Sequence, residues 1–364
     1  MFIDEKIINL VLLPFIISLI ITIIITPLVI YFTKRYGLMD DPKRKHPAIL
    51  HSKPLPRGGG IALFFGAFFA SVLLLPWNNI TGAIFLSAFI ALSIGVIDDA
   101  LNAKSKEISP YFRFLVNILC AVIVVGSGIT VPFITHPAGG ILHFDSILIF
   151  NYLGLTLTLA QVVAVLWIVW VINMLNWSSG VDGQVSGILA IAAIVIGILS
   201  LRFTSNELVL IDTKLSFIIA GTSLGFLFYH FHPSKILPGD GATALYLLVA
   251  VVSILSSSKL ATAILVLGIP SVDAMFTIIR RILSRKSPFA GDRKHLHHIL
   301  LDLGLSQRKI ALFYWLISAI VGVITLQLQS QGKFFVLLGM WVTIFGSLIF
   351  LHLLLWHKHE KNND

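Results

Sequence analysis

Two short acidic stretches lie at the ends of long apolar runs. Asp98 and Asp99 end the run in ALSIGVIDDALNAKSKE, and Asp240 lies between two glycines in FHPSKILPGDGATALYLLVA. A carboxylate at the edge of an apolar segment is costly unless a cation pairs with it. Mg²⁺ would suit these oxygen ligands, because it takes one or two carboxylates together with substrate phosphates. The glycines beside Asp240 would also let backbone N–H groups approach a phosphate closely.

Simpler explanations of these clusters stay open at this stage. Adjacent aspartates at a helix end can be solvated, and the PGDG stretch can be an ordinary turn. Asn173 and Asn176 are three residues apart, so they share one face of a helix. On that face they serve equally well as ligands or as hydrogen-bonding contacts between helices.

A further polar cluster, DRKHLHH, runs from Asp292 to His298. Its three histidines could indicate zinc, but no cysteine lies nearby. Several cations, among them Arg293, flank the histidines. A group of cations suits a polyphosphate better than a metal ion. Arg280 and Arg281, at the end of an apolar run, are more typical of topology determinants.

The elements that must position these residues are long apolar segments. The 364-residue chain is 57% hydrophobic and 12% charged, whereas a soluble domain has about a quarter of its residues charged. Runs of this kind, roughly 17–25 residues long, can each cross a membrane as a helix. We therefore expect an all-α integral membrane protein, a polytopic bundle of about 10–11 transmembrane helices, forming one domain over residues 1–364. The predicted spans are 7–33, 59–76, 80–97, 112–133, 158–175, 185–201, 214–229, 242–256, 260–279, 310–328 and 333–356.

The basic residues are distributed unevenly over the loops. If the N-terminus lies outside, 21 of the 26 Lys and Arg residues fall on one side of the membrane, together with all the polar clusters. The positive-inside rule makes this side cytoplasmic. The sequence thus predicts a multi-pass plasma-membrane protein with an active site facing the cytoplasm. Nucleic-acid binding is disfavoured, because the cations lie in short loops against the bilayer without a binding module. Cys120 is the only cysteine, so no intrachain disulfide can form.

Five segments, taken in order, resemble the polyprenyl-phosphate N-acetylhexosamine-1-phosphate transferases, the glycosyltransferase family 4 type. The resemblance covers about Gly37 to Ser306. The matching segments are RKHPAILHSKPLPRGGG (Arg44–Gly60), GVIDDALNAKS, NMLNWSSGVDG (Asn173–Gly183), PSKILPGDGAT and SPFAGDRKHLHHILLDLGLS, the last in the form of the branch that uses UDP-GlcNAc-type donors. The chain departs from the family pattern at Ser179, where aspartate is usual, at Ala242 and Thr243, and at His230 and His232.

The resemblance implies Mg²⁺-dependent transfer of an N-acetylhexosamine 1-phosphate, most simply GlcNAc 1-phosphate, from a UDP-sugar to undecaprenyl or another polyprenyl phosphate. UMP is released, and the product is the first membrane intermediate of a cell-envelope polysaccharide. The implied partners are a UDP-N-acetylhexosamine, the polyprenyl phosphate and the lipid bilayer. The oligomeric state, a homodimer included, stays open, and Mn²⁺ is an alternative to Mg²⁺.

The resemblance also implies a role for each candidate residue. These roles are catalysis for Asp98, Asp99 and Asp240, metal binding for Asn176 and Asp240, and substrate binding for His51, Lys53, Arg57, Asn173, Asp182, Arg293, His295, His297 and His298. Within the substrate-binding set, His51, Lys53 and Arg57 would attract the lipid phosphate. The histidine segment would contact the UDP-sugar.

Three other interpretations remain. A phospho-MurNAc-pentapeptide transferase of peptidoglycan synthesis belongs to the same family, but that branch tends to have three consecutive histidines, and Leu296 interrupts them here. A secondary transporter would place its site near the bilayer midplane in related halves, and no repeat is visible. An inactive protein of the same fold is suggested only by Ser179.

Overall fold

The computed structural model describes residues 5–43, 49–136, 140–152, 155–203, 207–255, 260–288 and 292–361. Helices dominate these ranges. The helices are α1 (Glu5–Ile7), η1 (Ile8–Leu12), α2 (Leu13–Arg35), α3 (Gly59–Leu74), α4 (Asn79–Asn102), α5 (Pro110–Gly126), α6 (Leu159–Trp177), α7 (Gln184–Ser200), η2 (Leu201–Phe203), α8 (Glu207–His230), η3 (Asp240–Ala242), α9 (Thr243–Ile254), α10 (Leu260–Val266), α11 (Gly268–Leu283), α12 (Leu296–Asp302), α13 (Gln307–Gln327) and α14 (Ser330–Lys361). The prediction of an all-α polytopic membrane protein is confirmed.

The eleven predicted spans each correspond to helical structure. In the described ranges, seven helices are long and apolar enough to cross a membrane, and the bent pair α10–α11 makes an eighth candidate. Three shorter apolar helices cover 59–74, 110–126 and 240–254. The run predicted at 112–133 is shorter than expected, because its helix ends at Gly126 and a β-hairpin follows.

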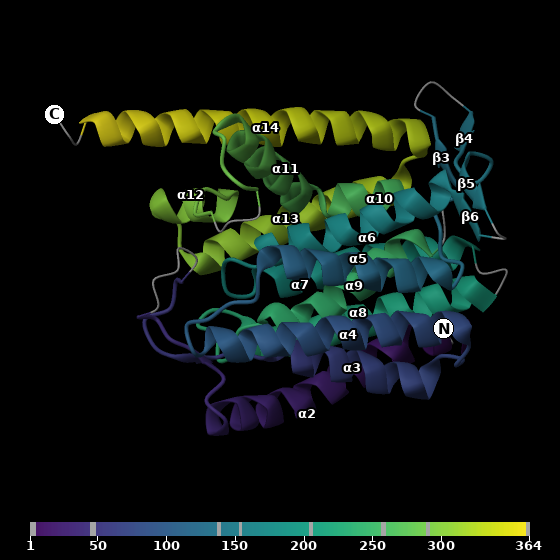
Figure 1. Cartoon of the computed structure of the whole chain (residues 1–364), viewed down its shortest axis with the longest axis horizontal. Helices are drawn as coiled ribbons and strands as arrows, with labels where there is room; N and C mark the ends of the chain where they lie inside the picture. Colours follow the sequence, from purple (N-terminus) through teal and green to yellow (C-terminus); the bar gives the residue numbers. More distant parts are fainter. Residues whose placement is uncertain are drawn as a thin grey trace.

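Most of the helices lie side by side with their axes roughly along one direction (Figure 1). Three small antiparallel pairs of strands join some of them: β1 (Met39–Asp40) with β2 (Leu55–Pro56), β3 (Phe133–Thr135) with β4 (Ile141–His143), and β5 (Leu148–Tyr152) with β6 (Leu155–Thr158). The strands β3–β6 lie at one end of the bundle, whereas α12 and the C-terminal ends of α2 and α14 lie at the other (Figure 1).

Local sequence signals explain where key helices begin or break. Asn78 caps α4 by accepting hydrogen bonds from the backbone N–H groups of Ile80 and Thr81, and Pro110 occupies the first turn of α5. The pair α10–α11 bends by 77°. Pro270 lies in the first turn of α11 and has no N–H to donate to the carbonyl of Val266, which favours a break in the helix at this point.

Close backbone packing brings the PGDG segment against α3 and α4. A Cβ atom at Gly60 would collide with the backbone of Gly241, and one at Gly95 would collide with the carbonyl of Asp240. Gly239 has a φ of +66°, a conformation that favours glycine, and a side chain there would collide with the Asp99 carboxylate. These glycines therefore bring two acidic motifs, 141 residues apart in sequence, into direct contact.

Candidate active site

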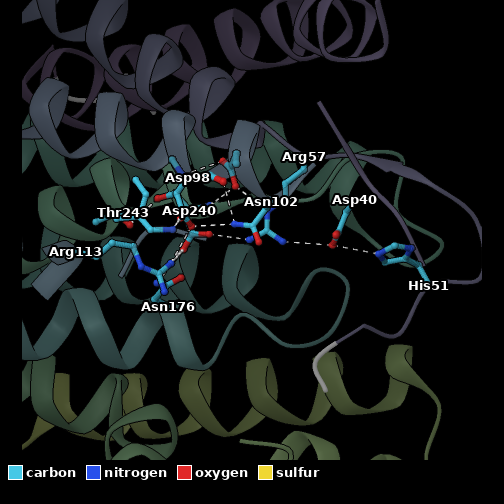
Figure 2. A network of polar contacts seen from close by, with 12 residues as sticks. Asp40, His51, Arg57, Asp98, Asn102, Arg113, Asn176, Asp240 and Thr243 are labelled. Carbon is cyan, nitrogen blue, oxygen red and sulfur yellow. Dashed lines mark hydrogen bonds and ion pairs between the residues drawn. The ribbon is translucent and has the colours of Figure 1, made fainter. Parts of the chain in front are cut away.

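Arg57 lies at the centre of an acidic network (Figure 2). Its Nε donates to Asp99 Oδ1 at 2.7 Å and its Nη2 donates to Asp240 Oδ2 at 2.7 Å. Nη1 lies 3.3 Å from Asp40 Oδ2. Burial lowers the pKa of Arg57, but Asp99, Asp240 and Asp40 outweigh this effect and hold the pKa above its usual value. The guanidinium group therefore stays charged at any working pH.

Arg113, in the first turn of α5, bridges the other carboxylates. Its Nη1 lies 3.0 Å from Asp98 Oδ2 and 2.7 Å from Asp240 Oδ1. Asp98 also accepts hydrogen bonds from the side chain of Asn102 at 3.0 Å and from the N–H of Ile108 at 2.6 Å. Sequence reasoning missed Arg113. The signal was present, because it is the only Lys or Arg in the apolar run that follows the aspartate pair.

The carboxylates differ in how far they reach the open space. The side chains of Asp98 and Asp99 are fully buried, and Asp99 is further fixed by the N–H groups of Asp240 and Gly241 at 2.8 and 3.2 Å. Asp240 itself lines a cavity of about 500 Å³. Asp98 and Asp99 therefore support Asp240 and the two arginines from behind, and neither lines that cavity.

The segment before α3 has a mixed outcome. His51 lines the cavity, with Nε2 at 3.3 Å from Asp40 Oδ2 and Nδ1 at 2.8 Å from the carbonyl of Lys53 (Figure 2). Arg57 also lines it. The side chain of Lys53 is exposed and lies outside the cavity lining. Residues 44–48, the start of this predicted motif, lie outside the described residues.

The two asparagines of α6 differ in their access to the large cavity. Asn176 lines the large cavity and its Nδ2 donates to Asp240 Oδ1 at 3.4 Å. Asn173 donates to the carbonyl of Val169 at 2.7 Å and lines only a neighbouring cavity of about 50 Å³. The spacing of three residues places both on a similar face, one turn apart, so only the one nearer the helix end reaches Asp240.

Asp182 lines the cavity beyond the end of α6. It accepts hydrogen bonds from His232 Nδ1 at 2.7 Å and from the N–H of Ser234 at 3.2 Å. Its own N–H donates to Gln307 Oε1 at 3.1 Å. The unexpected His232 is thus a partner of Asp182. Ser179, at the usually acidic position, also lines the cavity.

The three predicted histidines also line the cavity and are all buried. The rings of His295 and His297 are stacked, with centroids 5.7 Å apart, and His297 fits against Gly180, where any side chain would collide with it. Burial lowers the pKa of His297, and neighbouring His298 and His295 lower it further. Burial, with His295 and Arg293, lowers the pKa of His298 to about 4. His297 and His298 are therefore neutral at pH 7.

Arg293 does not line the cavity, although it was predicted to bind substrate. Its side chain is 55% exposed and lies 3.5 Å from Asp302. Instead, Arg280 and Arg281 act on the histidine segment by pairing with Asp292 Oδ2 at 2.5 and 3.0 Å. Burial raises the pKa of Asp292, but these two arginines outweigh it and lower the pKa overall. Residues 289–291 of the motif lie outside the described residues.

The donor set fits a magnesium ion that substrate phosphates would complete. Asp240 offers a carboxylate at the cavity wall, and Asn176 offers its amide oxygen beside it. Within the described ranges no three His, Cys, Asp or Glu side chains gather in a preformed metal site. Mg²⁺ needs no such cage, because it commonly uses one or two carboxylates plus substrate phosphates and water. Both Asp240 oxygens now bind guanidinium groups, so metal and arginine would share this carboxylate.

Residues 80–257 match the family described as glycosyl transferase family 4. A Bacillus subtilis (strain 168) protein named probable undecaprenyl-phosphate N-acetylglucosaminyl 1-phosphate transferase is 33% identical over 363 residues, covering 96% of this chain and 91% of the relative. This match extends well beyond the segment covered by the family match.

More distant relatives fall into two groups. A Mycobacterium tuberculosis (strain H37Rv) decaprenyl-phosphate N-acetylglucosaminephosphotransferase is 28% identical, over 83% of this chain and 78% of the relative. A Moorella thermoacetica phospho-N-acetylmuramoyl-pentapeptide-transferase is 27% identical, over 87% of this chain and 98% of the relative. Of these three relatives, the one with the highest identity is named as an undecaprenyl-phosphate N-acetylglucosaminyl 1-phosphate transferase.

Proposed function

Because the chain belongs to glycosyl transferase family 4, we propose that it transfers N-acetylglucosamine 1-phosphate from a UDP-sugar to a polyprenyl phosphate and releases UMP. The observation that carries this proposal is the convergence of five sequence motifs on one cavity at one end of a membrane bundle. Its volume of about 500 Å³ falls within the usual range for ligand sites. Its walls combine arginines, a carboxylate with amide ligands, and buried histidines.

The reaction joins two anions, so its main obstacle is charge. An oxygen of the lipid phosphate attacks the β-phosphorus of the UDP-sugar. The bond from that phosphorus to the bridging oxygen breaks, and the oxygen leaves with UMP. Arg57 and Arg113 would supply fixed positive charge beside the reacting phosphates. Mg²⁺, held by Asp240 and Asn176, would neutralise charge on the diphosphate.

The buried aspartates have a supporting role in this scheme. Asp98 and Asp99 hold Arg113 and Arg57 in place through ion pairs of 3.0 and 2.7 Å. A strong general base is not required, because a phosphomonoester has its second pKa near 6 and is largely deprotonated at pH 7. Asp98 as a base therefore stays a prediction. Orientation of the arginines is the role that its contacts support better.

We also propose that the cavity opens toward the cytoplasm. The protein is a multi-pass membrane protein, and α12 lies at one end of the bundle (Figure 1). By sequence, most of the Lys and Arg residues belong to the loops on the side of the membrane that includes the α12 segment. In a Cys120→Ser background, single cysteines at Lys104 and Ser287 should react only from the cytoplasmic side. A cysteine at Asp145, on the hairpin side, should react only from the other. Labelling of Lys104 and Asp145 positions from the same side would overturn this orientation.

The decisive assay uses the purified full chain, Mg²⁺, undecaprenyl phosphate and a panel of UDP-sugars, with UMP release as the readout. We expect release with UDP-GlcNAc and none without lipid. Excess EDTA should stop the reaction, and Mg²⁺ or Mn²⁺ should restore it. Turnover only with UDP-MurNAc-pentapeptide would replace the proposed donor by that of the second group of relatives. Absence of UMP release with every donor would refute the transferase proposal itself.

A further inference from the structure

A buried carboxylate behind the histidine wall has no role in the proposed reaction so far. Asp273 lies on α11, is 2% exposed and does not line the cavity. Among the described residues no Lys or Arg pairs with it; its ion-pair partner is His295. A buried carboxylate is strongly destabilising unless its oxygens are hydrogen-bonded. The contacts that satisfy Asp273 therefore indicate what it is for.

Both oxygens of Asp273 contact the histidine segment. Oδ2 lies 3.0 Å from Nδ1 of His295, and Oδ1 accepts the N–H of Leu296 at 2.9 Å. The first contact places a proton on Nδ1 of His295. Within the described part of the chain nothing hydrogen-bonds Nε2 of that ring, and the residue lines the cavity. Nε2 is therefore the ring nitrogen left for a ligand.

The second contact fixes the beginning of α12. This helix has seven residues, too few to be stable by itself. The N–H of its first residue, Leu296, is one of the donors that a helix leaves without an internal partner, and Asp273 accepts it. His297 and His298 follow directly on the same helix. One carboxylate thus sets the ring orientation of His295 and the placement of the other two histidines.

Neighbouring residues of α11 extend this support. Thr277, one turn after Asp273, lies 3.3 Å from Nδ1 of His295 through its Oγ1. Arg281, one further turn along, donates to the carbonyl of Ser287 at 2.6 Å and pairs with Asp292. One face of the helix α11, which lies between α13 and α14, therefore holds the histidine segment at several points (Figure 1).

We propose that Asp273 is a positioning residue for donor binding, acting through His295 and the start of α12. The inference rests on the proposed function, because the ligand it names is the diphosphate or sugar of a UDP-sugar. Asp273 touches no substrate, so its removal acts only where the histidines act. The lipid phosphate is expected to bind at the arginine end, so substitution of Asp273 should not change its binding.

The test compares Asp273→Asn, His295→Gln and the double variant in two-substrate kinetics. The amide of Asp273→Asn can still accept one hydrogen bond but loses the charge, so we expect a rise of about tenfold in the KM for the UDP-sugar. The KM for the polyprenyl phosphate should change less than about twofold. If Asp273 acts through His295, the double variant should be no worse than His295→Gln, because the effects of coupled residues do not add.

Asp302→Asn is the matched control, since it makes the same change at an exposed carboxylate of α12 and should leave both KM values unchanged. UMP binding, measured by calorimetry, gives a readout without turnover and should weaken in parallel with the KM. The positioning role would be overturned if the double variant showed the product of the two single effects, or if Asp273→Asn left the donor KM unchanged. Either result counts against it only when the wild-type chain still releases UMP. An inactive wild-type chain would instead count against the proposed function.

If Asp273→Asn fails to fold, Asp273→Glu keeps the carboxylate and allows the same comparison. We then expect a smaller donor-KM rise of about threefold, again absent in the His295→Gln background. An equal rise in both backgrounds would show that Asp273 has a merely structural role.

Discussion

The two ends of the cavity satisfy their polar groups in opposite ways. At the arginine end, Arg57 and Arg113 pair with Asp98, Asp99 and Asp240 at distances of 2.7–3.0 Å. At the histidine end, Nδ1 of His297 and Nδ1 of His298 are buried and have no hydrogen-bond partner among the described residues. A ligand at the arginine end must exchange existing bonds, whereas a ligand at the histidine end can add bonds that are missing.

This difference predicts different kinetic roles. Leaving a buried polar group without a partner costs about 1–3 kcal/mol, so a ligand that satisfies such a group gains binding energy in the ground state. At the arginine end, the guanidinium groups are already held in place by ion pairs, so they can stabilise negative charge that develops in the transition state. We therefore expect changes at the arginine end to reduce kcat, and changes at the histidine end to raise the donor KM.

The largest effect is expected at Asp240, where both arginines and the proposed metal meet. Asp240→Asn removes the charge that Arg57 and Arg113 share, and it removes the carboxylate proposed to hold the metal at the cavity wall. We expect kcat to fall by at least about 100-fold, measured as UMP release, because several kcal/mol of charge stabilisation is lost. Asp41→Asn, in the exposed loop before α3, is the control. Near-normal turnover in Asp240→Asn would refute the metal assignment.

Substitutions at Arg113, which the sequence did not identify, test whether this residue acts at the arginine end of the cavity. Arg113→Met leaves Asp98 buried with Asn102 and the N–H of Ile108 but without a cation. We expect kcat to fall by about 30-fold with little change in the donor KM. Arg113→Lys should recover part of this loss, since a point charge can pair with one carboxylate but cannot span two as a guanidinium can. Lys106→Met is the matched control in the preceding loop. A change confined to the donor KM would place Arg113 with the histidines.

The sequence predicts the bundle better than the site, for a physical reason. A span is encoded locally, because about 20 apolar residues in succession are needed to cross the hydrocarbon layer. All eleven predicted spans therefore correspond to helices, while the four strands β3–β6 of the connecting hairpins are short and left no comparable pattern. The break at α10–α11 had only the sequence position of Pro270 to indicate it.

Site contacts depend on distances that sequence spacing does not report. The aspartates and Asp240 were expected together, and Arg57 was a candidate, but the position of Arg113 between Asp98 and Asp240 could be identified only from the packing of α5. Lys53 and Arg293 were expected to bind substrate because they stand beside matching residues, yet neither side chain lines the cavity. Asp273 lay inside an apolar run without any nearby motif, and only the fold brings it to His295.

At the histidine end, His297→Ala should affect binding more than turnover. The ring is buried against Gly180 and its Nδ1 has no hydrogen-bond partner in the described part of the chain, so its removal deletes a contact available to the bound donor. We expect the KM for the UDP-sugar to rise about tenfold and that for the lipid to stay within about twofold. His136→Ala, on the hairpin side, is the control. A rise in the lipid KM alone would mean that the lipid phosphate, and not the UDP-sugar, binds at the histidine end.

The histidine end should also make the stability of the protein depend on pH. In the folded chain the pKa of His298 is depressed from an ordinary 6.5 to about 4, first by burial and then by His295 and Arg293. Its contribution to stability is thus present above pH 6.5 and is lost as the pH falls toward 4. The loss is about 2 kcal/mol at pH 5. The melting temperature of His298→Gln should therefore fall less between pH 7.5 and 5 than that of the wild type. An identical fall in both proteins would contradict this assignment.

The smallest effect is expected at Lys53, which lies outside the cavity near its arginine end. Among the described residues, the contact that links Lys53 to the site is made by its backbone carbonyl, which lies 2.8 Å from Nδ1 of His51, and Lys53→Ala keeps this carbonyl. The exposed ammonium group can still attract an anionic lipid headgroup over a Debye length of about 10 Å. We expect the KM for the polyprenyl phosphate to rise about twofold at low salt and to return to the wild-type value at about 0.5 M salt, where the field is screened.

The kinetics of Lys53→Ala should be compared with those of Lys43→Ala, an exposed lysine earlier in the same loop. If both variants raise the lipid KM equally, the loop acts through its total charge and not through a site at Lys53. A tenfold rise that persists in high salt would mean that the Lys53 side chain reaches the lipid phosphate directly. A rise in the KM for the UDP-sugar would be more serious, because it would place a cation of the arginine end on the donor and remove the distinction between the two ends.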